Sequence, residues 1–151
     1  MKKFFGIVVV LMVVFCLVGC SLQKNNDVEI GVEIMKLEIG NLEIGNYAFE
    51  VDLEKNATVA ELLKLLPLEI NMNELNGNEK YYSLDSRLPT NVQRINQIKA
   101  GDIMLWQDNC LVIFYKSFST TYSYTKIGHI KDTTNLLAAV GAGNVQVKWS
   151  I

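Results

Sequence analysis

The stretch IKAGDIMLWQDNCLVIFYKSFSTTYSYTKIGHI, residues 98–130, determines how the chain can be arranged. It contains two short apolar runs, residues 103–106 and 110–115, that are rich in the β-branched and aromatic side chains typical of strands. Gln107-Asp108-Asn109 between them tolerates turn geometry, so the stretch predicts a β-hairpin. Because both runs are almost continuously apolar, we expect burial on both faces, as in a barrel wall covered by a helix.

Short runs on either side extend the β pattern. Residues 37–41 and 42–46 repeat as LEIGN-LEIGN, and residues 28–34 (VEIGVEI) echo them. We expect this repeat to form the first hairpin of a sheet, with the Gly-Asn pairs as turns or bulges. Further strands are expected over residues 47–53, 68–72, 125–130 and 145–151, with a long ordered loop over residues 83–99.

Two short helices are also predicted. Thr58 and, three residues later, Glu61 have the spacing of a capping box, and Pro67 ends this first helix. Thr133 or Thr134 caps the second helix, which glycine residues end. Many short strands with two short helices indicate a mainly β fold, a closed β-barrel with helical lids.

The first residues of the chain have a different character. Lys2-Lys3 is followed by an apolar run, residues 4–18, that is shorter than the roughly 20 residues needed to span a bilayer. The tetrapeptide Leu17-Val18-Gly19-Cys20 resembles the lipobox of bacterial lipoproteins, in which cleavage precedes a lipid-bearing cysteine. We expect a signal peptide over residues 1–19, a lipidated tether over residues 20–27 and one domain over residues 28–151. An ordinary secretory signal with an incidental cysteine is the alternative.

This organisation predicts a protein anchored by lipid at Cys20 to the extracytoplasmic face of the cell membrane. Cys16 would leave with the signal peptide, so Cys110 would be the one free thiol and no internal disulfide would form. Cys110 lies in an apolar run, and we interpret it as a small buried hydrophobic residue.

Charge and motifs narrow the classes of function. The net charge is −2, from 14 Lys and Arg against 16 Asp and Glu, without a basic cluster, which argues against nucleic acid as a partner. The sequence has no metal-ligand spacing, G-x-S-x-G motif or phosphate loop, so we expect no metal, no cofactor and no catalytic residue of those types.

Several blocks, in order along the chain, resemble the bacterial cyclophilin-like domain family. They are LLPL at 65–68, LNGNEKY at 75–81, LP at 88–89, AGDIML at 100–105, CLVIFYKSFST at 110–120 and IGHI at 127–130. The resemblance covers about residues 37–151. It implies a closed eight-stranded β-barrel with a helix at each end.

The resemblance also implies a candidate activity. Cyclophilins isomerise the peptide bond before proline, using an arginine, a histidine and aromatic residues around an apolar groove. In this sequence Tyr124 aligns with the pocket histidine, and His129 falls after Gly128. Arg87 and Arg94 lie in the loop, and neither matches the segment that carries the cyclophilin arginine. We therefore interpret His129 as a strand residue, and keep prolyl isomerisation of secreted proteins as the alternative function.

The favoured interpretation is a module that binds a peptide segment or a small ligand in a cleft at the side of the barrel. Aromatic rings and a hydroxyl-rich loop, residues 116–124, would supply apolar contact and hydrogen bonds. Core packing of the rings and a self-capping loop are the alternatives. An assembly role on the barrel surface is a third class. The candidate ligand-binding residues are Glu79, Tyr81, Trp106, Phe114, Ser117, Ser119, Thr120, Tyr122 and Tyr124.

Overall fold

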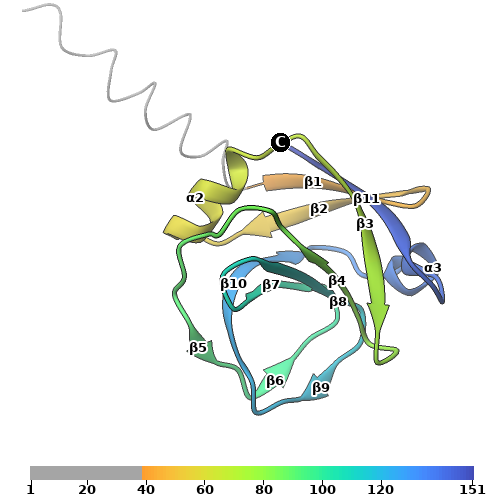
Figure 1. Cartoon of the computed structure of the whole chain (residues 1–151). Helices are drawn as coiled ribbons and strands as arrows, with labels where there is room; N and C mark the ends of the chain where they lie inside the picture. The colour runs from red at the N-terminus through yellow and green to blue at the C-terminus, as the bar shows by residue number, and fades with distance from the viewer. Residues whose placement is uncertain (1–38) are drawn as a thin grey trace, which may run out of the picture. The chain divides into compact units, whose positions relative to one another are not determined.

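The computed structural model describes residues 39–151, which fold mainly into short antiparallel strands (Figure 1). The predicted signal peptide, the Cys20 tether and the repeat at residues 28–34 lie outside the described residues. Within residues 39–151, no helix is long and apolar enough to cross a membrane. The elements in chain order are β1 (Ile39–Ile44), β2 (Tyr47–Leu53), α2 (Ala57–Leu63), β3 (Leu68–Leu75), β4 (Glu79–Ser83), β5 (Gln93–Arg94), β6 (Gln97–Ile98), β7 (Asp102–Trp106), β8 (Cys110–Phe114), β9 (Phe118–Ser119), β10 (Ser123–Ile130), α3 (Leu136–Val140) and β11 (Val145–Ser150).

Eight of these strands close into a barrel. Their order is β2-β1-β11-β3-β4-β8-β7-β10, and β10 pairs with β2 to complete the ring. β5 adds to the outer side of β10, and β6 pairs with β9 as a separate ribbon, the β6/β9 ribbon. The predicted fold class, a mainly β chain forming a closed eight-stranded barrel with two short helices, is confirmed for residues 39–151.

The predicted hairpin is present as β7 and β8, joined by a turn in which Gln107 has a φ of 56°. Ile103 and Leu105 face the barrel interior and belong to the inner core, the cluster that fills the barrel. Met104 and Val112 face outward into a second cluster. Burial on both faces is therefore confirmed, because consecutive side chains of a strand point to opposite faces and both faces are covered.

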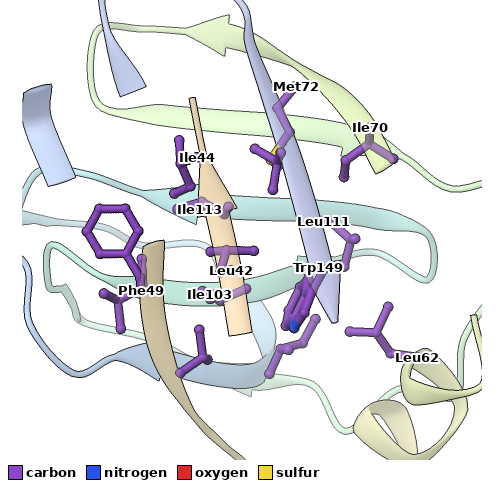
Figure 2. Packing of buried hydrophobic residues seen from close by; sticks show 14 of the residues in the cluster. Leu42, Ile44, Phe49, Leu62, Ile70, Met72, Ile103, Leu111, Ile113 and Trp149 are labelled. Atoms are coloured by element: carbon purple, nitrogen blue, oxygen red, sulfur yellow. The ribbon is translucent and has the colours of Figure 1, made fainter. Parts of the chain in front are cut away.

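The covering element differs from the expectation. The outward-facing cluster, called here the outer cluster, consists of Ile95, Ile98, Met104, Val112, Phe114 and Tyr124. The β6/β9 ribbon and the segment around β5 cover this cluster. The prediction that a helix covers the outer face of the hairpin was therefore wrong. The helices serve the inner core instead: Val59 and Leu62 of α2 pack into the interior, where Leu42, Ile103 and Trp149 also gather (Figure 2).

Two local predictions were wrong, and tertiary contacts explain both. Asn56, not Thr58, caps α2 by accepting a hydrogen bond from the Val59 amide at 2.9 Å. The Thr58 hydroxyl instead donates to the Pro89 carbonyl at 2.6 Å. At α3 the position before the helix is Asn135, which makes no side-chain cap, so neither threonine caps it.

Residues 39–46 of the LEIGN repeat form a single strand, β1, and the turn that joins it to β2. The first hairpin therefore pairs the repeat with residues 47–53, and its two copies do not pair with each other. Gly45 turns the chain with a φ of 57°. Gly40 does not make a turn: it lies within β1, where a Cβ would come 2.9 Å from the indole nitrogen of Trp149. The first Gly-Asn pair therefore makes room for a buried tryptophan, and the second makes the turn.

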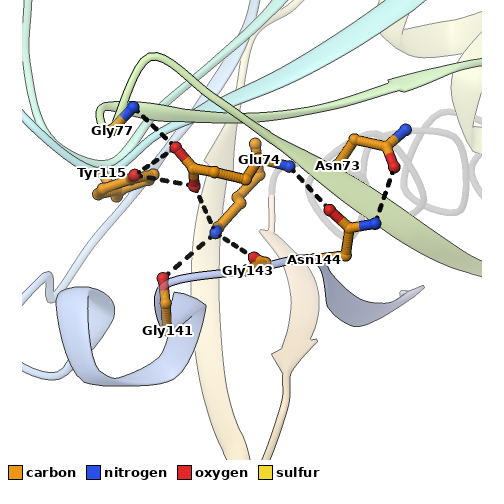
Figure 3. A network of polar contacts seen from close by, with 8 residues as sticks. Asn73, Glu74, Gly77, Tyr115, Gly141, Gly143 and Asn144 are labelled. Atoms are coloured by element: carbon orange, nitrogen blue, oxygen red, sulfur yellow. Dashed lines mark hydrogen bonds and ion pairs between the residues drawn. The ribbon is translucent and has the colours of Figure 1, made fainter.

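A buried ion pair joins the β3–β4 hairpin to the segment after α3 (Figure 3). Lys80 is completely buried, and its ammonium lies 2.6 Å from Glu74 Oε2. It also donates to the carbonyl oxygens of Gly141, at 3.2 Å, and Gly143. Tyr115 donates its hydroxyl to the Glu74 carboxylate at 2.9 Å. The charge of Lys80 is thus compensated on several sides, which a buried ammonium requires.

The network also sets the titration of Glu74. Burial raises the pKa of this carboxyl, but hydrogen bonds from Lys80, from the Tyr115 hydroxyl and from the Gly77 amide outweigh that effect and hold the pKa below its ordinary value of 4.5. A carboxyl with a lower pKa in the folded state contributes stability above its unfolded-state pKa. This contribution is lost as the pH falls below about 4.5 through the folded-state value.

We expect Lys80→Met to destabilise the protein by about 3 kcal/mol or more, because it leaves the Glu74 carboxylate and two backbone carbonyls without their cation. Lys148→Met is the matched control: Lys148 pairs with Glu69 at 3.0 Å, but both side chains are exposed. Its cost should be about 0–1 kcal/mol. Urea unfolding of the two variants measures the difference, and equal midpoints would contradict the role assigned to the buried pair.

Candidate functional site

The larger of the two best-defined hollows lies on the outer wall of the barrel, between β10, β7 and the segment around β5. We call it the outer groove, and its volume is about 440 Å³. Its walls are mostly charged and amide side chains, and Ile95 and Met104 of the outer cluster lie beneath them with little exposed surface. The lining residues are Glu54, Arg94, Ile95, Asn96, Gln97, Lys99, Asp102, Met104, Lys126, Gly128 and His129.

A bulge in β10 shapes one wall of this groove. The register of β10 against β7 shifts between Lys126 and Gly128, so Ile127 is an extra residue. Ile127 and Ile130 both point into the inner core although they are three residues apart. For the same reason Lys126 and His129, also three residues apart, both line the groove.

His129 is fixed by a carboxylate on the neighbouring strand. Its Nδ1 lies 2.9 Å from Asp102 Oδ1, and Asp102 Oδ2 accepts the Lys99 amide at 2.8 Å. A carboxylate oxygen accepts hydrogen bonds, so Nδ1 is the donor in this contact and Nε2 is the nitrogen left to a ligand. Gly101 gives the ring its space, because a Cβ there would lie 3.1 Å from His129 Cε1 and 2.7 Å from Thr133.

The hydroxyl-rich loop supports the groove from behind. Ser119 donates its hydroxyl to Gln97 Oε1 at 3.1 Å, and the Thr120 amide donates to the Asn96 carbonyl at 3.2 Å. Ser117 accepts from the Ala100 amide at 2.9 Å. Two hydroxyls and one backbone amide of this loop therefore hold the segment around β6, from which Asn96, Gln97 and Lys99 line the groove.

The predicted aromatic residues divide into buried and exposed rings. Phe114 and Tyr124 pack edge to face in the outer cluster, with ring centroids 5.6 Å apart, and Tyr81 is partly buried against them. Tyr124 is 7% exposed, whereas Trp106 is 42% and Tyr122 65% exposed. Burial, reinforced by the charge of Glu79, raises the pKa of Tyr124 to about 12, so its hydroxyl stays protonated at neutral pH.

Glu79 lies at the start of β4, opposite Phe114 of β8. Burial and the nearby charge of Glu74 raise the pKa of this carboxyl. Burial likewise raises the pKa of the Cys110 thiol, which is partly buried beside the outer cluster and is free. A thiol with a raised pKa is a poor nucleophile, in keeping with the structural interpretation of Cys110.

None of the predicted ligand-binding residues lines the outer groove. Glu79, Tyr81, Phe114 and Tyr124 lie in or beside the outer cluster, and Ser119 and Thr120 lie behind the groove wall. Their role in binding stays a prediction. Sequence reasoning missed Arg94, Asp102, Lys126 and His129 as a group. The signal that could have found them is the apolar spacing Ile127-Gly128-His129-Ile130, which fits one buried face only if the strand bulges.

A smaller hollow of about 250 Å³ lies between the start of β2 and the segment after β10, and is lined by Tyr47, Ala48, Phe49, Glu50, Lys131, Asp132 and Asn135. Lys131 forms ion pairs there with Glu50 and Asp52. Among the residues that the structure describes, no three His, Cys, Asp or Glu side chains meet in a way that could hold a metal ion.

A family model described as the Cyclophilin-like family matches residues 42–150. The match runs from within β1 to the end of β11 and so includes every strand of the barrel. No curated protein matches the chain.

We expect Tyr124→Ala to destabilise the protein by about 3–5 kcal/mol, because the ring is buried against Phe114. Tyr122→Ala should change stability by no more than about 0.5 kcal/mol, since this ring is exposed. Thermal unfolding followed by circular dichroism compares the two. A Tyr124→Ala protein as stable as the parent would show that this ring is free to serve a ligand.

Proposed function

The chain belongs to the cyclophilin-like family, and we propose that it is a binding protein that takes an extended peptide segment or a small ligand in the outer groove. The observation that carries this proposal is the groove itself. Its volume of about 440 Å³ lies within the range of roughly 300–1,000 Å³ that is typical of ligand pockets. The charged and amide side chains that line the groove would make most of the contacts with the ligand, because Ile95 and Met104 are only 7% and 3% exposed.

One wall of the groove presents amide side chains, of which Gln97 is held in place. Asn96 and Gln97 offer amide groups along one wall, and Gln97 is fixed by Ser119 at 3.1 Å. Side chains that are already oriented lose less conformational entropy when they bind. The Ser117 and Thr120 contacts support the same wall, so the hydroxyl-rich loop contributes to binding by positioning rather than by touching the ligand.

A second candidate function is prolyl isomerisation, and one observation favours it. Arg94 and His129 line the same groove beside Met104, although neither lies where the sequence alignment expects a cyclophilin residue. Rotation about the peptide bond must overcome a barrier of roughly 20 kcal/mol because the amide loses its resonance. A donor such as the Arg94 guanidinium, placed near the prolyl nitrogen, would stabilise the rotated amide.

We further propose that the protein acts at the extracytoplasmic face of the membrane, anchored through lipid on Cys20. The support is the sequence: a basic start, a short apolar run and the Leu17-Val18-Gly19-Cys20 box. A lipid anchor would keep the groove close to proteins that emerge from the membrane. The tether of residues 20–27 would separate the domain from the lipid surface.

We expect the purified full chain to bind acetyl-Ala-Ala-Pro-Ala-amide, and Arg94→Ala to weaken binding about tenfold through loss of a charged hydrogen bond. Arg87→Ala is the matched control, because Arg87 is an exposed arginine in the same loop that lies outside the groove. Calorimetry measures binding, and an isomerisation assay on the same peptide separates the two functions.

The outcomes of that experiment differ for each hypothesis. Binding without catalysis supports the binding protein. Catalysis that Arg94→Ala loses and Arg87→Ala keeps supports the isomerase. A folded protein that neither binds nor isomerises the peptide would contradict both.

We expect Cys20→Ala to move the protein from the membrane fraction to the soluble fraction of the cells or medium, because a signal without its cysteine cannot receive the lipid. Cys110→Ala is the control, since that thiol lies in β8 and should not affect anchoring. Unchanged membrane fractionation of the Cys20→Ala protein would contradict lipidation at this residue.

A further inference from the structure

Most Lys and Arg side chains of the described chain interact with a partner within the protein. Five Lys and Arg side chains form ion pairs with carboxylates: Lys64, Lys80, Arg87, Lys131 and Lys148. Lys116 lies over the ring of Tyr115 at 5.8 Å, and Lys55 also has a partner. Within residues 39–151 this leaves three cationic side chains with neither an ion pair nor a ring contact: Arg94, Lys99 and Lys126.

All three of these side chains line the outer groove. They reach it from different parts of the chain: Arg94 from β5, Lys99 from the turn between β6 and β7, and Lys126 from β10. Three unpaired cations therefore converge on one hollow in a protein whose net charge is −2. Convergent cations without internal partners are the arrangement that recognises an anion.

The acids of the groove do not cancel these charges. Asp102 is already engaged, with one oxygen 2.9 Å from His129 Nδ1 and the other accepting the Lys99 amide. Glu54 follows β2 and forms no ion pair with any described residue. Leaving His129 aside, the groove thus holds three cations against two carboxylates, Glu54 and Asp102, an excess of one positive charge.

We propose that the outer groove selects ligands that carry an oxyanion, either a carboxylate or a phosphate. This inference rests on the proposed binding function and specifies the chemistry of its ligand. Arg94 offers a planar fork suited to two oxygens, and Lys99 and Lys126 act as point charges beside it. The nearby Nε2 of His129 adds a further polar contact.

The test uses matched peptides and the full chain in a non-ionic detergent. The first set of peptides places a single Glu at successive positions of acetyl-Ala-Ala-Pro-Ala-amide. The second set has Gln at the same positions and serves as its neutral partner. A third set carries phosphoserine and a fourth serine. We expect the best Glu or phosphoserine peptide to bind about tenfold more tightly than its neutral partner. This preference should shrink as the salt concentration rises from about 0.05 to 0.5 M.

Substitutions of single lysines test which side chains produce the preference for anionic peptides. Lys99→Gln and Lys126→Gln should each reduce it about threefold, through loss of one charge near the anion. Lys64→Gln is the control, because Lys64 is exposed at the C-terminal cap of α2, outside the groove, and is paired with Glu61. The control should leave the preference unchanged.

The results separate this inference from the proposed function. A Glu preference identifies a carboxylate ligand, a phosphoserine preference identifies a phosphate ligand, and either supports the inference. Peptides that bind equally well with and without the anion overturn it and leave the binding function standing. A folded protein that binds no peptide of any set overturns both.

Discussion

Closure of the barrel depends on the absence of a side chain at Gly128. This residue pairs with Leu53 where β10 meets β2, and a Cβ there would come 2.5 Å from the Asp52 carbonyl oxygen and 3.0 Å from Val51. Such distances are shorter than atoms tolerate, so only glycine lets the two strands approach. The pairing of β10 with β2 turns the curved sheet into a ring, and the inner core can then be enclosed on all sides.

The same segment links the fold to the groove. The bulge that precedes Gly128 returns Ile127 and Ile130 to the interior, and it thereby turns Lys126 and His129 outward beside β7. Asp102 on β7 then orients the imidazole at 2.9 Å. The constraint that closes the barrel therefore also creates a polar wall next to Met104, so the candidate site is a consequence of how the ring is completed. At the β3–β4 end of the barrel, the buried pair of Lys80 and Glu74 joins the hairpin to the segment after α3.

Sequence reasoning succeeded where structure is set by neighbours in the chain. The β7–β8 hairpin and its two buried faces could be predicted because the apolar runs and the turn are adjacent. Thr58 was assigned as a cap because its spacing to Glu61 is right, but its hydroxyl bonds to Pro89, 31 residues away, which no local pattern reveals. The groove was missed for a similar reason. Arg94 and His129 come from separate segments, and a bulge brings Lys126 and His129 to one face. The family resemblance supplied the fold as a whole, and the family model supports it over residues 42–150.

Ring closure also has a consequence for how copies of this protein behave at high concentration. Strands at the edge of an open sheet offer unpaired amides and carbonyls to other chains, which leads to edge-to-edge aggregation. In the described part of the chain, the open edges belong to β5 and to the β6/β9 ribbon, and each of these strands is two residues long. Edges this short give an incoming strand few backbone hydrogen bonds. The barrel is thereby protected against self-association through its sheet, although half of the residues in the chain are hydrophobic.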